Sequence, residues 1–283
     1  MKPVSPYIAA LALLACTPTS PAAPEPVSLT QLWRIEGLAN PESAAVSEDG
    51  SFLYVTNVNG EGDAKDGNGF ISRISTDGRL LEREWARGMN GPKGLMRGGD
   101  ALYVSDIDRM VVIDVATGAV RRTVEIPGAG FLNDLAFARD GAVLIADSAG
   151  ARIYAIASDA AAIWLEDPLL DSINGLLAEP DRLLVTTMAG RLLAVDWETR
   201  AISVLAEGLG NADGVASIGE GRYLVSEWPG LMHTVTPDGA HETILDTRAE
   251  ERYLNDFLLI GDTLYQPHWE PSAFTAYRVA GMR

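Results

Sequence analysis

A short pattern recurs six times along the chain and limits the folds that it can adopt. Each copy contains a strand-like apolar run, and these runs align at residues 52–57, 101–106, 142–147, 182–187, 222–227 and 263–268. A polar residue, here called an opener, begins the segment before each run: Glu42, Lys93, Asn133, Asn174, Asp213 and Asn255. Neighbouring openers are 51, 40, 41, 39 and 42 residues apart. A period near 40 residues, with four short strands in each unit, is typical of a β-propeller with one blade per repeat.

The repeat therefore predicts an all-β, six-bladed β-propeller over residues 29–283, closed by an N-terminal strand. The sixth copy has no fourth strand of its own, whereas residues 29–37 (LTQLWRIEG) precede the first repeat and look like one. We expect this segment to pair with the last blade and close the ring. The insertion at residues 57–69 lengthens the first interval. We interpret it as a lid or specificity loop, or as a plain surface excursion.

The beginning of the chain is predicted to be a targeting segment, with residues 1–15 as a signal peptide of the lipoprotein type. Lys2 is followed by an apolar stretch at residues 7–15 that is too short to span a bilayer. The residues leading to Cys16 resemble a bacterial lipobox, which predicts lipidation of Cys16; an ordinary secretory signal cut a few residues later is the alternative. Residues 16–28 are Pro-rich, as expected of a tether. Together these features predict a periplasmic, membrane-anchored lipoprotein, or otherwise a secreted protein.

The charge and the cysteine count narrow the possible partners. The formal net charge is −17, from 22 Lys and Arg against 39 Asp and Glu. Such a balance opposes nucleic-acid binding, which depends on cationic contacts, and suits a cationic ligand or a divalent metal. Cys16 is the only cysteine, so an intramolecular disulfide and a thiolate metal site are both excluded.

The openers are the candidate functional residues. In a propeller blade the first strand lies nearest the central axis, so the six openers should meet at one mouth of the channel. Glu42, Asn174 and Asp213 would supply two carboxylates and one carboxamide, which suit Ca²⁺ or Mg²⁺ and can also hold Zn²⁺ or Mn²⁺. Taken singly, however, Asn-Gly and Asp-Gly pairs are also ordinary turn residues.

Four motifs at these positions resemble the senescence-marker-protein/gluconolactonase family of six-bladed propellers. The motifs are PES at 41–43, LND at 132–134, INGL at 173–176 and ADGV at 212–215. The resemblance implies that Glu42, Asn174 and Asp213 bind one divalent cation and that Asn133 contacts the substrate. It also implies hydrolysis of a lactone or related ester, in which the cation polarises the carbonyl and Asp213 takes a proton from water.

The pattern departs from the family at Phe131, where the family often has an arginine that recognises sugar-acid oxygens. An apolar lactone or ester is therefore as reasonable a substrate as a sugar lactone. The ends of the second strands should face the same mouth, and the candidate substrate-binding walls, besides Phe131, are Asp106, Asp147, Glu227, Trp228, His268 and Trp269. The alternative function is a non-catalytic propeller, resembling NHL-repeat proteins, that binds a ligand or a protein at the cell envelope.

Overall fold

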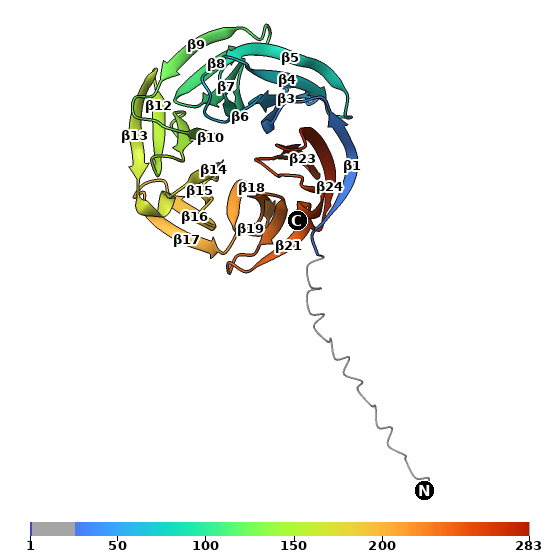
Figure 1. The fold of residues 1–283 in the computed structure, drawn as a ribbon. Coiled ribbons are helices and arrows are strands. Elements are labelled where there is room, and N and C mark those ends of the chain that lie inside the picture. Colours follow the sequence, from blue (N-terminus) through green and yellow to red (C-terminus); the bar gives the residue numbers. More distant parts are fainter. Residues whose placement is uncertain (2–25, 283) are drawn as a thin grey trace.

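Six four-stranded antiparallel sheets form a closed ring in the computed structural model, which describes Met1 and residues 26–282 (Figure 1). The prediction of an all-β, six-bladed propeller is confirmed. Apart from Met1, the predicted signal peptide lies outside the described residues, as do the lipidation site Cys16 and most of the 16–28 tether. Within the described part, no helix has the length and apolar character needed to cross a membrane.

The blades follow one another along the chain, and strands are hydrogen-bonded in sequence order within each of the first five. Blade one contains β2 (Pro41–Val46), β3 (Phe52–Asn57), β4 (Gly69–Ser75) and β5 (Leu80–Met89). Blade two contains β6 (Pro92–Gly98), β7 (Ala101–Asp106), β8 (Arg109–Asp114) and β9 (Val120–Glu125). Blade three contains β10 (Leu132–Phe137), β11 (Val143–Asp147), β12 (Arg152–Ala157) and β13 (Ala160–Glu166). Blade four contains β14 (Ile173–Ala178), β15 (Arg182–Thr187), β16 (Arg191–Asp196) and β17 (Ile202–Glu207). Blade five contains β18 (Asn211–Gly219), β19 (Arg222–Trp228), β20 (Leu231–Val235) and β21 (His241–Asp246).

Blade six closes the ring with the N-terminal strand of the propeller. It contains β22 (Leu258–Ile260), β23 (Thr263–His268), β24 (Ala273–Ala280) and β1 (Ser28–Glu36). The pairing of β1 with β24 is antiparallel along the whole of β1, which confirms the predicted closure. Trp33 of β1 stacks on Phe274 with ring centroids 6.1 Å apart, and its Nε1 donates to the Thr76 carbonyl of blade one at 3.1 Å. The closing strand therefore also joins the last blade to the first.

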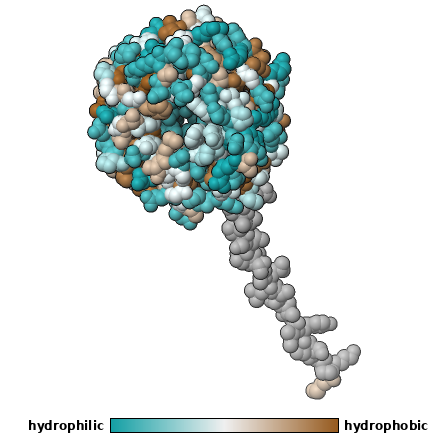
Figure 2. Space-filling view, viewed as in Figure 1, coloured by the Kyte–Doolittle hydropathy of each residue, from teal (hydrophilic) through white to brown (hydrophobic). Residues whose placement is uncertain are grey.

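The hydrophobic core lies in the seams between blades. In β3, Leu53 and Val55 face a cluster that includes Phe274 of blade six, whereas Tyr54 faces a cluster that includes Leu102 of blade two. Alternate residues of one strand are thus buried against two different neighbours, so a single blade cannot bury both faces. On the face shown in Figure 2, hydrophilic residues predominate and apolar ones are scattered.

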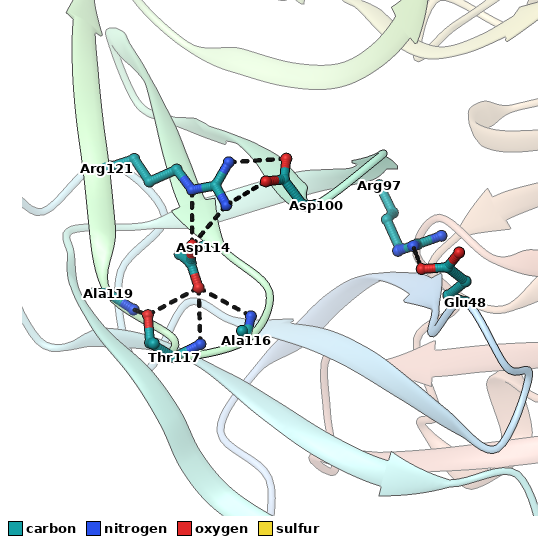
Figure 3. A network of polar contacts seen from close by, with 8 residues as sticks. All are labelled: Glu48, Arg97, Asp100, Asp114, Ala116, Thr117, Ala119 and Arg121. Atoms are coloured by element: carbon teal, nitrogen blue, oxygen red, sulfur yellow. Dashed lines mark hydrogen bonds and ion pairs between the residues drawn. The ribbon is translucent and has the colours of Figure 1, made fainter.

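Polar turns between strands are fixed by local contacts, as blade two shows (Figure 3). The Oδ1 of Asp114 accepts hydrogen bonds from the backbone N–H and the hydroxyl of Thr117, both at 2.9 Å. Arg121 of β9 donates to Asp114 and to Asp100. Hydrogen bonds from Arg121 and Thr117 lower the pKa of Asp114 to about 2. These contacts stabilise the strand connections and lie apart from the channel.

Candidate functional site

All six openers line one cavity of about 350 Å³. They are Glu42, Lys93, Asn133, Asn174, Asp213 and Asn255. The rest of the lining is formed by Gly62, Asp63, Phe131, Met188, Trp228 and Trp269. Residues some 40 positions apart in the sequence therefore meet in space, because each lies at or near the start of an innermost strand. Phe131, Trp228 and Trp269, three of the predicted wall residues, are part of this lining.

Each of the first five openers lies in an irregularity of its strand, where the ladder to the second strand shifts register. For Asp213, the shift falls between Ala212 and Val215, and for Asn174 it falls between Ile173 and Leu176. Comparable shifts surround Glu42, Lys93 and Asn133. A β-bulge re-aims side chains and leaves backbone groups without their ladder partners. The opener side chains are thereby turned toward the channel, and the backbone needs other hydrogen-bond partners.

Hydroxyl groups on the second strands supply these partners. Thr186 accepts a hydrogen bond from the Gly175 N–H at 2.8 Å and donates to the carbonyl of Asp213 in the next blade. Ser226 likewise accepts from the N–H after Asp213, at 2.8 Å, and donates to the Asn255 carbonyl at 2.8 Å. Each hydroxyl thus ties one opener segment to the next around the ring. The same link to the following opener is made by Thr56 and Ser105.

The sequence contains a second signal, distinct from the openers, that marks these links. The fifth residue of the six aligned runs is Thr or Ser in four of them, and Ala146 and Pro267 replace it in the other two. In blade three, where Ala146 has no hydroxyl, the carboxylate of Asp134 accepts the Leu176 N–H at 2.7 Å and makes the link to blade four. A recurring hydroxyl in an otherwise apolar strand therefore marks a structural hydrogen bond.

The three predicted metal ligands have buried oxygens without hydrogen-bond partners. These atoms are Glu42 Oε2, Asn174 Oδ1 and Asp213 Oδ1, and the three side chains are at most 5% exposed. Unpartnered buried oxygens are costly, and hard oxygen donors of this kind suit a divalent cation. Within the described residues, no group of three or more His, Cys, Asp and Glu is arranged to hold a metal ion. The candidate ligand set consists instead of two carboxylates and one amide, and these residues fit such a cation.

The electrostatics of the cavity also favour a bound positive charge. Burial raises the pKa of Glu42 well above its usual value, and the negative charge of Asp213 adds to the shift. Burial and the nearby charge of Asp256 likewise raise the pKa of Asp213. Lys93 opposes the shift of Glu42. A cation between the two carboxylates would favour their ionised forms.

A second layer of buried carboxylates lies directly behind the openers. Asp134 follows Asn133, and its oxygens accept two backbone N–H groups at 2.7 Å. Asp256 follows Asn255 and accepts the Ser43 hydroxyl at 2.6 Å, which connects blade six to blade one. Burial raises the pKa of Asp256 to about 6. In these Asn-Asp pairs the Asn lines the mouth, whereas the Asp stabilises contacts between blades.

Four of the predicted wall residues, Asp106, Asp147, Glu227 and His268, are absent from the cavity lining. Asp147 Oδ1 accepts the N–H groups of Gly130 at 3.2 Å and Phe131 at 3.0 Å, so its carboxylate holds the segment that leads into Asn133. The last residue of the strand faces this loop because the loop N–H groups need an acceptor. Asp106, also outside the lining, makes the same contacts to the loop before Lys93.

Glu227 and His268 are likewise engaged inside their blades. Glu227 Oε2 lies 2.7 Å from Nε2 of His233. His268 is fully buried, and its Nε2 lies 2.8 Å from the Thr275 hydroxyl. Burial lowers the pKa of His268 to about 3, so its ring is neutral at physiological pH. Trp269, the residue after His268, lines the cavity instead.

The predicted insertion reaches the same mouth as the openers. Residues 58–68 connect β3 to β4 and bring Gly62 and Asp63 into the cavity lining. The loop is attached to blade two by an ion pair between Lys65 and Asp108 and by a hydrogen bond from the Gly67 N–H to Asn90 at 3.1 Å. Its position fits a wall of the site.

The fold and the site together define a six-bladed β-propeller with an acidic, amide-lined mouth. No family model matches the chain, and no curated protein matches it. Virginiamycin B lyase from Staphylococcus aureus is similar in structure, with a TM-score of 0.66 and 14% identity over 89% of this chain and 99% of that chain. A protein provisionally described as a gluconolactonase has a TM-score of 0.65 and 17% identity over 91% and 93% of the two chains. A streptogramin B lyase structure has a TM-score of 0.65 and 12% identity over 89% and 98%.

These likenesses confirm the predicted resemblance to gluconolactonase-type propellers at the level of the fold. The chain is thus distantly similar to propellers named for two different activities, a lyase and a gluconolactonase. At such low identity a shared fold does not carry a shared activity, so function has to be argued from the residues of the site.

Proposed function

We propose that this propeller is a divalent-cation-dependent hydrolase that opens a lactone or a related ester at the mouth lined by the openers. The observation that carries the proposal is the convergence of three unpartnered, buried oxygens, from Glu42, Asn174 and Asp213, in one cavity. The cation, which can be Ca²⁺, Mg²⁺, Zn²⁺ or Mn²⁺, would be held by these three residues. When bound, it supplies Lewis acidity toward an ester carbonyl.

The chain's own groups account for the remaining chemistry. The carboxylate of Asp213 takes a proton from the attacking water, and the hydroxyl oxygen bonds to the carbonyl carbon. The bond between the carbonyl carbon and the ring oxygen then breaks, and that oxygen takes the proton, so the product is a hydroxy acid. Asn133 lines the cavity and orients the substrate through its amide.

Metal binding and hydrolysis are tested together on purified protein. After metal removal, each cation is added back while the melting temperature is followed, and ring opening of a panel of lactones is measured by acid release. A cation at about 100 times its Kd should stabilise the wild type by about 2.7 kcal/mol, because it binds only the folded state. Asp213→Ala and Glu42→Gln should abolish both responses. Glu48→Gln, an exposed carboxylate after the same strand, should keep them.

The alternative, a non-catalytic propeller that binds a ligand or protein at the same mouth, gives the opposite outcome. The wild type would then bind no metal and hydrolyse none of the lactones. We further propose, from the sequence alone, that the enzyme works in the periplasm, held to the membrane by a lipid on Cys16. Mass spectrometry of the mature N-terminus in a bacterial host tests that placement.

A further inference from the structure

The only basic side chain lining the cavity, among the described residues, is bound to the cavity wall. Lys93 is 3% exposed, and its Nζ donates to the Gly62 carbonyl at 2.6 Å and to the Gly91 carbonyl at 3.4 Å. The same ammonium lies 4.0 Å from the centroid of the Phe131 ring, in cation–π geometry. Its positive charge is therefore directed at two carbonyls and an aromatic face.

These contacts hold the insertion loop and the wall residue Phe131 together. Gly62 belongs to the insertion, Lys93 to blade two and Phe131 to blade three. A Cβ added at Gly62 would lie 3.5 Å from the Phe131 ring, so the loop backbone packs closely against that ring. Burial lowers the pKa of Lys93 to about 8, which leaves it charged at neutral pH. The three residues form a continuous wall across two blades and the loop.

Much of the remaining lining is apolar. Met188, Trp228 and Trp269 line the cavity together with Phe131. The Trp228 ring packs against Tyr253 with centroids 4.7 Å apart, which limits its movement. The insertion also contributes Asp63, whose negative charge disfavours an anionic ligand. An entering molecule therefore meets the polar side chains of the openers and the apolar side chains of the remaining lining.

We propose that this mouth selects lactones or esters with an apolar body, and that Lys93 is the positioning residue that fixes the selecting wall. This inference rests on the proposed function. A hydroxylated or anionic substituent that lies on the ring faces of Phe131 and the two tryptophans would lose its hydration and gain no partner there, because the ammonium beside Phe131 already has its own. An alkyl or aryl substituent has no hydrogen bonds to water to lose there, and its burial is favourable.

The substrate class is tested with three γ-lactones that differ in the substituents on one ring. They are γ-nonalactone, with a pentyl chain, 2-hydroxyglutarate γ-lactone, with a carboxylate at the same carbon, and galactono-γ-lactone, which is polyhydroxylated. We expect kcat/KM of the metal-loaded wild type to be about 100-fold higher for γ-nonalactone than for either polar lactone, the discrimination that an apolar pocket shows against an added hydroxyl. Equal or faster turnover of a polar lactone would overturn the inference.

The role of Lys93 is tested by Lys93→Met, with Glu61→Gln, an exposed charge on the same loop, as the control. Lys93→Met should speed hydrogen exchange at residues 58–68 and raise KM for γ-nonalactone about tenfold, with a smaller change in kcat, because the loop must then be ordered on binding. Phe131→Ala should raise the same KM. Glu61→Gln should leave KM unchanged. If Lys93→Met instead changes neither quantity, or reduces mainly the turnover of the carboxylated lactone, Lys93 does not act as proposed.

Failure of the proposed function would be distinguishable from failure of this inference. If no lactone is hydrolysed, binding of two unreactive cyclic ethers still decides the selectivity. Pentyltetrahydrofuran should quench tryptophan fluorescence, and this change should be reduced in Trp228→Phe. Tetrahydrofuran-carboxylate should cause no quenching at the same concentrations. Tighter binding of the carboxylate would refute the apolar preference, whatever the catalytic result.

Discussion

Two adjacent threonines in β15 provide a direct test of how the openers are held. Thr186 and Thr187 are both fully buried, but only Thr186 uses its hydroxyl to link the Gly175 N–H to the Asp213 carbonyl. The Thr187 hydroxyl has no hydrogen-bond partner. Replacing each threonine by valine removes the same atom and preserves shape. The two variants therefore differ mainly in the hydrogen bonds that are lost.

The expected magnitudes follow from the groups left unpaired. Thr186→Val leaves one N–H and one carbonyl in a bulge without hydrogen-bond partners, and each unpaired group costs about 1–3 kcal/mol. The added methyl group offsets about 1 kcal/mol of this loss. The free energy of unfolding should fall by about 1–5 kcal/mol, which lowers Tm by roughly 2–20 °C for a domain of this size. Thr187→Val removes an unpaired buried hydroxyl, so its stability should equal or exceed that of the wild type.

Urea denaturation of the metal-free protein measures both changes. Thr186→Ser keeps the hydroxyl and should recover most of the loss. Because Thr186 holds the backbone of Asp213, Thr186→Val should also weaken cation binding, whereas Thr187→Val should leave it intact. Equal stability of the two valine variants would refute the assignment of the hydroxyl link.

Three further predictions concern other parts of the ring. Gly175→Ala should strongly destabilise the protein, because its Cβ would overlap the Asp213 carbonyl oxygen, whereas Gly62→Ala has room and should melt like the wild type. Deleting residues 28–36 should abolish soluble folded protein in gel filtration, since the β24 edge would be left unpaired. Because burial raises the pKa of Asp256 to about 6, the metal-free fold holds that proton more tightly than the unfolded chain does, so stability should fall as pH rises from about 4 to 6. Asp256→Asn should flatten that fall when unfolding is followed by circular dichroism; an unchanged slope would contradict it.

The fold was predictable because the blade is a repeated unit whose strands are short and similarly spaced. The run at residues 52–57 coincides with β3, and the run at 182–187 coincides with β15. The convergence of the openers also followed from the repeat alone. The repeat does not predict the direction of the side chains at the strand ends, because that direction depends on which loop N–H groups lack partners. Asp147 was expected to face the cavity, but it binds the backbone of Phe131 from behind.

The buried charges of the channel give a reason for the cation that is independent of family resemblance. Glu42, Asp134, Asp213 and Asp256 are all buried carboxylates with raised pKa values, whereas Lys93 is the only base among the openers. The Asp134 and Asp256 carboxylates have hydrogen-bond donors from neighbouring blades, so their burial is offset by the contacts that they make. Glu42 and Asp213 each retain an oxygen with no donor, and the one nearby ammonium is occupied by carbonyls. Protons can neutralise these two carboxylates only when the pH is low enough, whereas a divalent cation can do so at neutral pH and also satisfies the amide oxygen beside them.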